Sequence, residues 1–200
     1  MKVYDITQEL LGCSVYPGDP APQRTVMQSM EDGALYNLSG FQMCAHNGTH
    51  IDAPAHFLKD GRTVDEIAIE AFVGMAYVVQ HDGIVSADDA SFMLRKAREA
   101  DDRAARRIII KGSAEVSLEA AEVFTRADLL LLGNESQSVG PEDAPMAVHK
   151  ALLSRDIVLL EGIRLSSVPE GVYLLSAAPL NIAGAEGSPC RAVLIDLGEI

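Results

Sequence analysis

The chain has 200 residues and a mass of 21.4 kDa, and 48% of its residues are hydrophobic, which suits a single domain over residues 1–200 with an ample core. Its formal net charge of −13 argues against nucleic acid or an anionic membrane surface as a partner, because binding to phosphates depends on Lys and Arg. No run approaches the roughly 18 apolar residues of a membrane span, and the N-terminus lacks the apolar stretch of a signal peptide, so we expect a cytoplasmic protein with no membrane partner.

The first half of the chain is dominated by short strand patterns. Strands are predicted at 3–6 and 24–28, and a third at 41–46 leads into a histidine-rich segment. A fourth strand at 74–80 is closed by His81-Asp82-Gly83, which is typical of a turn. His81 is therefore predicted to be only a turn residue.

Helices alternate with strands in the second half. Ser86 is predicted to cap a helix at 87–100 whose apolar residues share one face, and Ser117 to cap a second at 118–124. The charged run 95–107 is interpreted as a solvated face or loop. The remaining predicted elements are strands at 107–111, 129–132, 158–161, 172–176 and 192–196 and a short helix at 145–153. This alternation predicts an α/β domain built on a mixed sheet.

Three histidines and an aspartate lie close together in a chain that has five histidines. Gly48, Thr49 and Pro54 disfavour a helix here, so we expect a bent strand end or loop. All four positions are even, and an extended chain directs such side chains to one face. They are His46, His50, Asp52 and His56.

Two imidazoles and one carboxylate from this segment make a set of three ligands that suits a divalent transition metal. Such a set leaves coordination positions open for water or substrate, which indicates catalysis rather than a structural metal. The alternative is a group of polar residues on an ordinary surface loop. The density of the cluster favours the metal.

The segment from His46 to Phe57 resembles the His-x-Gly-Thr-His-x-Asp-x-Pro-x-His-Phe signature of the cyclase family, which includes bacterial kynurenine formamidases and isatin hydrolases. Residues 16–19, Tyr-Pro-Gly-Asp, are similar to the aromatic-Pro-Gly-Asp turn of that family. His149 and Glu161 resemble the later His and Glu pair of the formamidases. Segments 178–180 and 187–191 resemble the C-terminal Pro-Leu and Gly-Ser-Pro-x-Arg segments, so the resemblance spans nearly the whole chain.

The resemblance implies a swivelling β/β/α architecture with a barrel-like core. It implies that His46, His50 and Asp52 bind a first divalent ion, Zn or Mn, and that Asp52 also reaches a second ion. The resemblance assigns the other ligands of that second ion to His149 and Glu161. It makes His56 a proton shuttle; the alternative is a ring that only orients a metal ligand.

The number of ions, one or two, stays open from the sequence. His149 lies in a short predicted helix, where it could equally be an exposed residue. Glu161 ends an apolar run that predicts a buried strand, and a carboxylate there needs a cation or hydrogen bonds to offset its desolvation. A protein with a single ion would leave this pair to bind substrate or to orient the site.

The first hypothesis is a metal-dependent hydrolase of a small amide, an arylformamidase-like enzyme acting on a formamide or a cyclic amide. A metal lowers the pKa of bound water and polarises a carbonyl, and a histidine returns the proton to the amine leaving group. The alternatives are a metal-containing binding protein without turnover, and a cyclase or dehydratase that uses the same metal. An intact His56 favours catalysis.

The predicted substrate contacts are Tyr16, Asp19 and Phe57, although residues 16–19 could equally form a turn with no further role. Many relatives carry an Asp-x-x-Ser-x-Asp stretch where this chain has Gly133 to Val139, so specificity is expected to differ. The chain has no Trp, and an aromatic substrate would have to stack on Tyr16, Phe57, Tyr36 or a residue of a partner subunit.

The resemblance also implies homodimers or tetramers. Apolar residues at 41–44 or 72–76 could serve such contacts, but periodicity does not distinguish an interface from a core. The three cysteines, Cys13, Cys44 and Cys190, are odd in number and far apart, which fits reduced thiols better than a disulfide framework.

Overall fold

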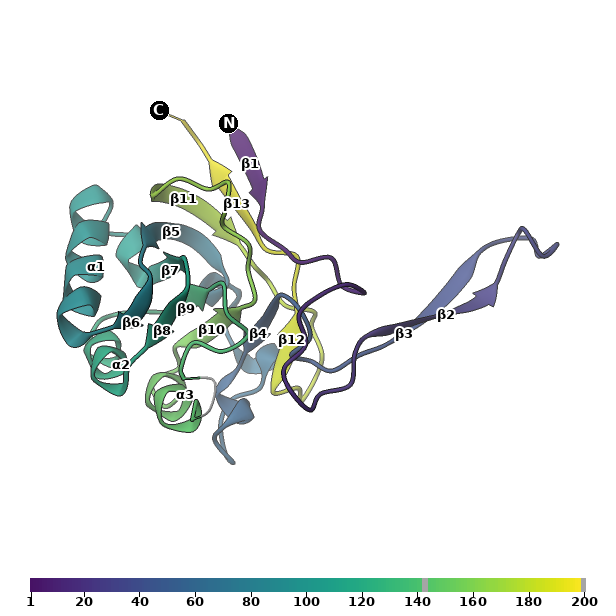
Figure 1. The fold of residues 1–200 in the computed structure, drawn as a ribbon, viewed down its shortest axis with the longest axis horizontal. Helices are drawn as coiled ribbons and strands as arrows, with labels where there is room; N and C mark the ends of the chain where they lie inside the picture. The colour runs from purple at the N-terminus through teal and green to yellow at the C-terminus, as the bar shows by residue number, and fades with distance from the viewer. Residues whose placement is uncertain (142–143, 199–200) are drawn as a thin grey trace.

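The computed structural model describes residues 1–141 and 144–198. In this part of the chain a curled, nine-stranded mixed sheet has the order β1-β13-β11-β5-β7-β9-β10-β4-β12, and three α-helices cover one of its faces (Figure 1). The strands, in this order, are Lys2–Asp5, Val193–Asp196, Gly171–Ser176, Val73–Gln80, Arg107–Lys111, Leu131–Asn134, Val158–Glu161, His50–Asp52 and Gly187–Pro189. The predicted α/β domain with a mixed, barrel-like sheet is confirmed.

The centre of the sheet is parallel and its two ends are antiparallel. Strands β5, β7, β9 and β10 run parallel to one another, whereas β11, β13 and β1 at one end and β4 and β12 at the other are antiparallel to their neighbours. The helices that cover the sheet are α1 (Ala87–Ala100), α2 (Leu118–Thr125) and α3 (Met146–Leu153). Short 3-10 helices are η1 (Pro54–His56), η2 (Val64–Glu66), η3 (Ile69–Ala71) and η4 (Ala104–Arg106).

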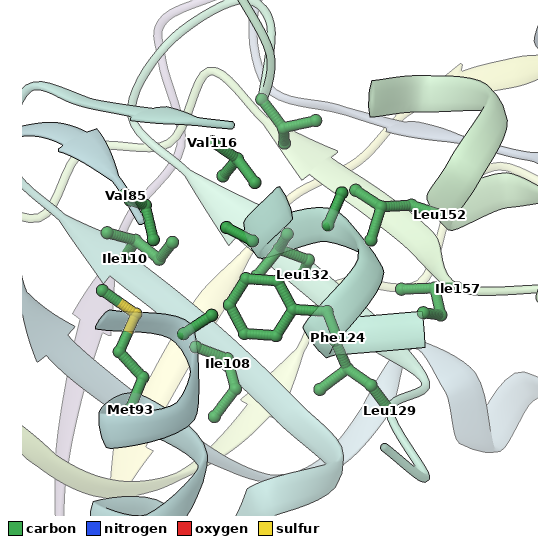
Figure 2. Packing of buried hydrophobic residues seen from close by; sticks show 14 of the residues in the cluster. Val85, Met93, Ile108, Ile110, Val116, Phe124, Leu129, Leu132, Leu152 and Ile157 are labelled. Carbon is green, nitrogen blue, oxygen red and sulfur yellow. The ribbon is translucent and has the colours of Figure 1, made fainter. Parts of the chain in front are cut away.

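The central strands are buried on both faces, which explains their continuous apolar sequences. On β7, Ile108 and Ile110 face the helices, where Phe124 of α2 is fully buried (Figure 2), and Ile109 faces the opposite cluster. The same alternation places Leu159 of β10 on the helix side and its neighbour Leu160 on the other. This periodicity decides which residues of β10 and β4 reach the helix side.

Two further strand pairs lie outside the large sheet. β6 (Gly83–Val85) pairs with β8 (Ala114–Val116) in parallel. β2 (Gln23–Gln28) pairs with β3 (Leu38–Gln42) in an antiparallel hairpin that projects far from the rest of the molecule (Figure 1). No helix in the described ranges is long and apolar enough to cross a membrane.

Most predicted elements occur within two residues of their expected bounds, and the helix at 87–100 and the strands at 107–111 and 158–161 match. The third predicted strand differs, because β3 ends at Gln42 rather than His46. Asn47 ends the extended conformation: its Oδ1 accepts a hydrogen bond from the Cys44 N–H (2.8 Å), and its own N–H donates to the Cys44 carbonyl. Residues 43–49 therefore turn before β4.

The strand predicted at 129–132 is shifted by two residues. β9 runs from Leu131 to Asn134, because its ladder with β7 pairs Arg107 with Leu131 and Ile110 with Asn134. The buried amide of Asn134 donates to the Ser138 carbonyl, which satisfies a polar residue inside the sheet. Apolarity alone did not predict the end of this strand.

Arg107 is not part of a solvated face, contrary to the interpretation of the run 95–107. Its side chain is buried, and its guanidinium donates to the carbonyl oxygens of Ala71, Met75 and Glu70. These hydrogen bonds offset the desolvation of the cation. In the proposed contact region 72–76, Phe72 and Ala76 are likewise buried in the core, whereas residues 73–75 are partly buried.

Candidate metal centre

Strands β4 and β10 place three of the predicted ligands on one face of the sheet. Their antiparallel register pairs His50 with Glu161 and Asp52 with Leu159. Ile51 and Leu160 point into the core cluster on the far face, so the alternate residues His50, Asp52 and Glu161 point to the helix side. The predicted common direction of His50 and Asp52 is thus a consequence of strand pleating.

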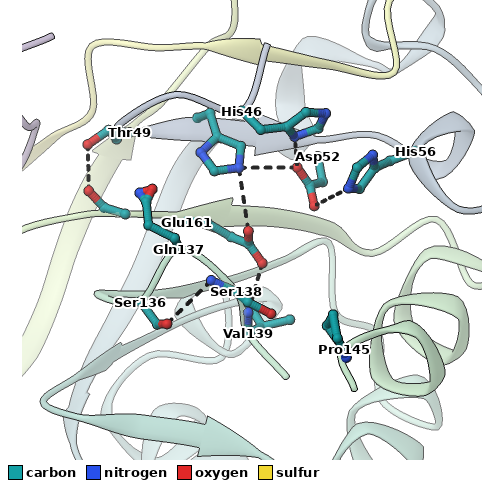
Figure 3. Close-up of polar contacts among 12 residues, drawn as sticks. His46, Thr49, Asp52, His56, Ser136, Gln137, Ser138, Val139, Pro145 and Glu161 are labelled. Carbon is teal, nitrogen blue, oxygen red and sulfur yellow. Dashed lines mark hydrogen bonds and ion pairs between the residues drawn. The ribbon is translucent and has the colours of Figure 1, made fainter. Parts of the chain in front are cut away.

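These three side chains are buried and close together. His50 Nε2 lies 3.4 Å from Asp52 Oδ1 and 3.4 Å from Glu161 Oε2. Glu161 Oε1 also accepts a hydrogen bond of 2.8 Å from the backbone N–H of Val139, which fixes the orientation of the carboxylate (Figure 3). The sequence did not indicate this role for the segment after β9.

His149 comes to the same place from α3. Its Nε2 lies 3.2 Å from Glu161 Oε1 and 3.6 Å from Asp52 Oδ2, and its side chain is buried. The alternative of an exposed helical residue is therefore wrong. His149 lies in the first turn of α3, and this helix packs against β10.

His46 belongs to the turn that precedes β4. Its Nδ1 is 2.8 Å from Asp52 Oδ1, and its ring packs edge-on against His50 with centroids 5.1 Å apart. The five side chains form two overlapping groups, and within each group the ligand atoms lie within 4.8 Å of one another. The first group is His46, His50 and Asp52, and the second is Asp52, His149 and Glu161. Asp52 belongs to both groups, as the resemblance implies.

Hydrogen bonds to backbone carbonyls fix the direction of two imidazoles. His50 Nδ1 donates to the Gly48 carbonyl and His149 Nδ1 donates to the Pro145 carbonyl, each over 2.9 Å. Because a carbonyl oxygen only accepts, the proton sits on Nδ1, and Nε2 of both rings faces the carboxylates. Such carbonyl partners typically orient histidines that bind metals.

The residues fit a divalent cation on the evidence of their own geometry. Among the described residues, Asp52 Oδ2 and His46 Nε2 are buried and have no hydrogen-bond partner. Asp52 and Glu161 are also two carboxylates in the protein interior, where an uncompensated charge is costly. Burial opposes a charge on the His50 ring, but hydrogen bonds and charges from Asp52 and Glu161 outweigh it and raise the pKa of His50 to about 10. Nitrogen and carboxylate ligands of this kind suit a divalent transition metal.

His56 stands beside this cluster, at the end of η1. Its ring stacks on His46 with centroids 4.0 Å apart, and its Nε2 lies 3.9 Å from Asp52 Oδ2. Burial lowers the pKa of His56 even though the Asp52 charge raises it, so the ring is neutral at pH 7. A neutral, partly exposed imidazole next to the cluster can accept a proton.

A cavity of about 280 Å³ opens onto the cluster. Tyr16, Asp19 and Phe57, the predicted substrate contacts, all line it, and the Phe57 ring lies 4.7 Å from the ring of His149. The cavity also includes Gln137 and Ser138, from the segment 133–139 in which the sequence predicts a difference in specificity. Ligand sites commonly form beyond the carboxyl ends of parallel strands, and this rule would have indicated these residues after β9.

Gly187 of β12 has no side chain, and the His46 ring occupies the space where a Cβ would lie. A Cβ at this position would lie 2.5 Å from Cε1 of His46. We expect Gly187→Ala to displace the ring, break its 2.8 Å contact with Asp52 and weaken metal binding by about 10- to 100-fold, the range seen when outer contacts of metal ligands are removed. Competition with a chromophoric chelator measures this loss.

The matched control is Gly40→Ala in the hairpin, where the new Cβ meets only the flexible end of Met27 at 3.4 Å. This variant should bind metal as the wild type does. Equal metal affinity in Gly187→Ala and the wild type would contradict the role of Gly187.

Comparison with known proteins agrees with this geometry. The family model "Putative cyclase" matches residues 4–141. A kynurenine formamidase from Salinibacter ruber is 34% identical over 98% of both chains, and one from Erythrobacter litoralis is 31% identical over 98% of this chain and 94% of its own. This chain belongs to the cyclase family.

Solved structures support the same assignment. A structure described as a potential metal-dependent hydrolase with cyclase activity superposes with a TM-score of 0.82, at 28% identity over 99% of both chains. Isatin hydrolase A from Labrenzia aggregata superposes with a TM-score of 0.80 over 96% of this chain and 93% of its own. At 21% identity, the second match shows the shared fold alone.

Proposed function

We propose that this protein is a metal-dependent hydrolase that cleaves the carbon–nitrogen bond of a small amide, with an aryl formamide as the substrate class. The observation that carries this proposal is the buried cluster of three imidazoles and two carboxylates on an open cavity. The full-length similarity to proteins named kynurenine formamidase supports the choice of substrate class.

We assign the first metal ion to His46, His50 and Asp52 and a second to Asp52, His149 and Glu161, with Zn and Mn as the candidates. A divalent ion in such a site supplies Lewis-acid polarisation of a carbonyl and lowers the pKa of bound water. The protein backbone orients the metal-binding side chains. The Gly48 and Pro145 carbonyls orient two of the imidazoles, and the Val139 N–H orients Glu161.

His56 is assigned the proton transfer. Its neutral ring accepts a proton from the attacking water and returns it to the departing nitrogen, which is a poor leaving group until it is protonated. The aromatic walls of the cavity, Tyr16 and Phe57, suit a flat aryl group next to the scissile bond, and Asp19 adds a carboxylate at the same wall.

Two further assignments accompany this function. We propose a cytoplasmic location, since the described cysteines are free and reducing conditions keep them so. We also propose that the protein acts as a homo-oligomer, and that its partner in solution is otherwise only the small-molecule substrate.

The experiment that tests the function uses N-formylkynurenine, with kynurenine release as the readout. Treatment with a chelator should abolish turnover, and Zn or Mn should restore it, with the ions per chain counted by elemental analysis. Turnover that persists in protein shown to be metal-free would contradict a metal-dependent mechanism. Restored metal without hydrolysis of any aryl formamide would contradict the proposed substrate class.

A further inference from the structure

The two nitrogens of the His46 ring face different carboxylates. Nδ1 lies 2.8 Å from Asp52 Oδ1, whereas Nε2 lies 3.4 Å from Glu186 Oε1. Cε1, the ring carbon between these nitrogens, is the atom that a Cβ at Gly187 would meet at 2.5 Å. The ring therefore lies against the backbone of β12, with Nδ1 toward the ligand groups and Nε2 toward the residue that precedes the strand.

The outer nitrogen of His46 differs from those of the other two imidazoles in the ligand groups. Nδ1 of His50 and Nδ1 of His149 each donate to a backbone carbonyl over 2.9 Å. Among the described residues, Nε2 of His46 is buried and makes no hydrogen bond. A histidine that binds a metal through one nitrogen carries its proton on the other, and that N–H normally donates to a carboxylate, a carbonyl or water. The Nε2–H of His46 therefore needs an acceptor, and Glu186 stands within reach.

The backbone holds Glu186 beside the cluster. Its carbonyl oxygen accepts a hydrogen bond from the Ala53 N–H over 2.9 Å, and the next residue, Gly187, pairs with Asp52 in the ladder of β12 and β4. The side chain is 49% exposed, so it can turn about its own bonds without repacking the core. A small rotation brings its oxygen from 3.4 Å to the about 2.7–2.9 Å of a hydrogen bond between an N–H and a carboxylate.

The charge of the ligand groups leaves a role for a further carboxylate. The two groups contain two carboxylates, Asp52 and Glu161, whose charge equals that of one divalent ion. A second ion would add two positive charges in the protein interior, where an uncompensated charge is costly. Glu186 is a third carboxylate, and it lies next to a ligand of the first group.

We propose that Glu186 is a positioning residue for the first metal ion: its carboxylate accepts the Nε2–H of His46 while Nδ1 serves as the ligand. This inference rests on the metal ligands assigned in the proposed function. A carboxylate partner fixes the tautomer and the orientation of the ring and makes the imidazole a stronger base, hence a stronger ligand. His50 and His149 have neutral carbonyl partners instead. The affinity for the first ion should therefore depend on an outer carboxylate.

The metal affinity of Glu186→Gln tests the proposal without any substrate. The substitution keeps the size of the side chain and removes its charge. Competition with a chromophoric chelator should show the Zn affinity for one ion per chain lowered by about tenfold, the low end of the range for outer partners, because the carboxylate is half exposed to solvent. Glu186→Ala, which also removes the acceptor, should lose at least as much.

The matched control is Glu99→Gln on α1. The Glu99 side chain is 70% exposed and lies 4.0 Å from Arg95 on the surface, so the same chemical change there should leave Zn affinity unchanged. Circular dichroism should show unchanged folding in all variants, because both glutamates are exposed.

The tautomers of the histidines give a second readout, which a purely structural role of Glu186 would not move. Long-range proton–nitrogen spectra of the Zn-loaded wild type should show the proton on Nε2 of His46 and on Nδ1 of His50 and His149. The Nε2–H of His46 should exchange slowly with water in the wild type and faster in Glu186→Gln. A Zn-loaded wild type with the His46 proton on Nδ1 would overturn the proposal.

The outcomes separate this inference from the proposed function. A wild type that binds no divalent ion would remove the metal site and this inference with it. Wild-type binding that Glu186→Gln leaves unchanged, or a loss that Glu99→Gln shares, would overturn the inference alone. Visible absorption of the Co²⁺-loaded protein reports the coordination number of the ion and should be the same in the wild type and Glu186→Gln. A different coordination number would make Glu186 a ligand of the ion, and would also overturn the inference.

Discussion

Asp52→Asn should abolish both metal retention and hydrolysis. Asp52 belongs to both groups of ligands, and the substitution keeps the volume of the side chain while it removes the negative charge that both ions would share. We expect metal affinity to fall by more than about 100-fold, beyond the loss caused by removing an outer contact of a ligand. Elemental analysis after dialysis measures retention, and kynurenine release measures turnover.

Asp128→Asn is the matched control for this prediction. The Asp128 side chain is 83% exposed and pairs with Arg106 on the surface, so the same chemical change there should leave metal content and turnover unchanged. An Asp52→Asn protein that keeps full metal content would show that the cluster is not the metal site. His50→Ala should behave as Asp52→Asn does, because the imidazole is fully buried among the same carboxylates.

The face shared by His50 and Asp52 was predictable from the sequence, because it depends only on the two-residue period of a strand. The same argument does not apply to His46, which lies in a turn, or to His56, which ends the 3-10 helix η1. Elements with strong local signals were also predictable. The helix α1 is an example, because Ser86 and Asp89 form a capping box at its N-terminus.

Contacts between distant segments were not predictable from local pattern. The distances from His149 to Glu161 and Asp52 depend on how α3 packs over β10, and only the family resemblance connected these residues beforehand. Arg107 was misjudged because its partners are backbone carbonyls 32 and 36 residues earlier in the chain. Every residue has a backbone carbonyl, so the sequence does not show which of them accepts this hydrogen bond. The projection of the β2–β3 hairpin was missed for a similar reason: its strands resemble ordinary sheet strands until the sheet order is known.

His56→Ala should retain metal but lose turnover by about 100- to 10,000-fold, the usual contribution of a general acid or base. The ring lies beside the cluster, at 3.9 Å from Asp52 Oδ2, but belongs to neither group of ligands, so metal content should not change. Added imidazole should restore part of the turnover if His56 transfers protons, whereas a ring that only orients His46 by stacking would not be replaced by a free molecule.

His81→Ala is the control for the histidine substitution, because His81 is not among the residues that line the cavity and its ring bonds to the Ile84 carbonyl. It should keep full activity, with or without imidazole. Loss of metal from His56→Ala would instead assign the ring to holding the ligands, and rates that match the wild type would remove it from the mechanism. Of the three histidines at 46–56, only His56 belongs to neither ligand group. Measuring both metal content and turnover of His56→Ala therefore separates proton transfer from metal binding.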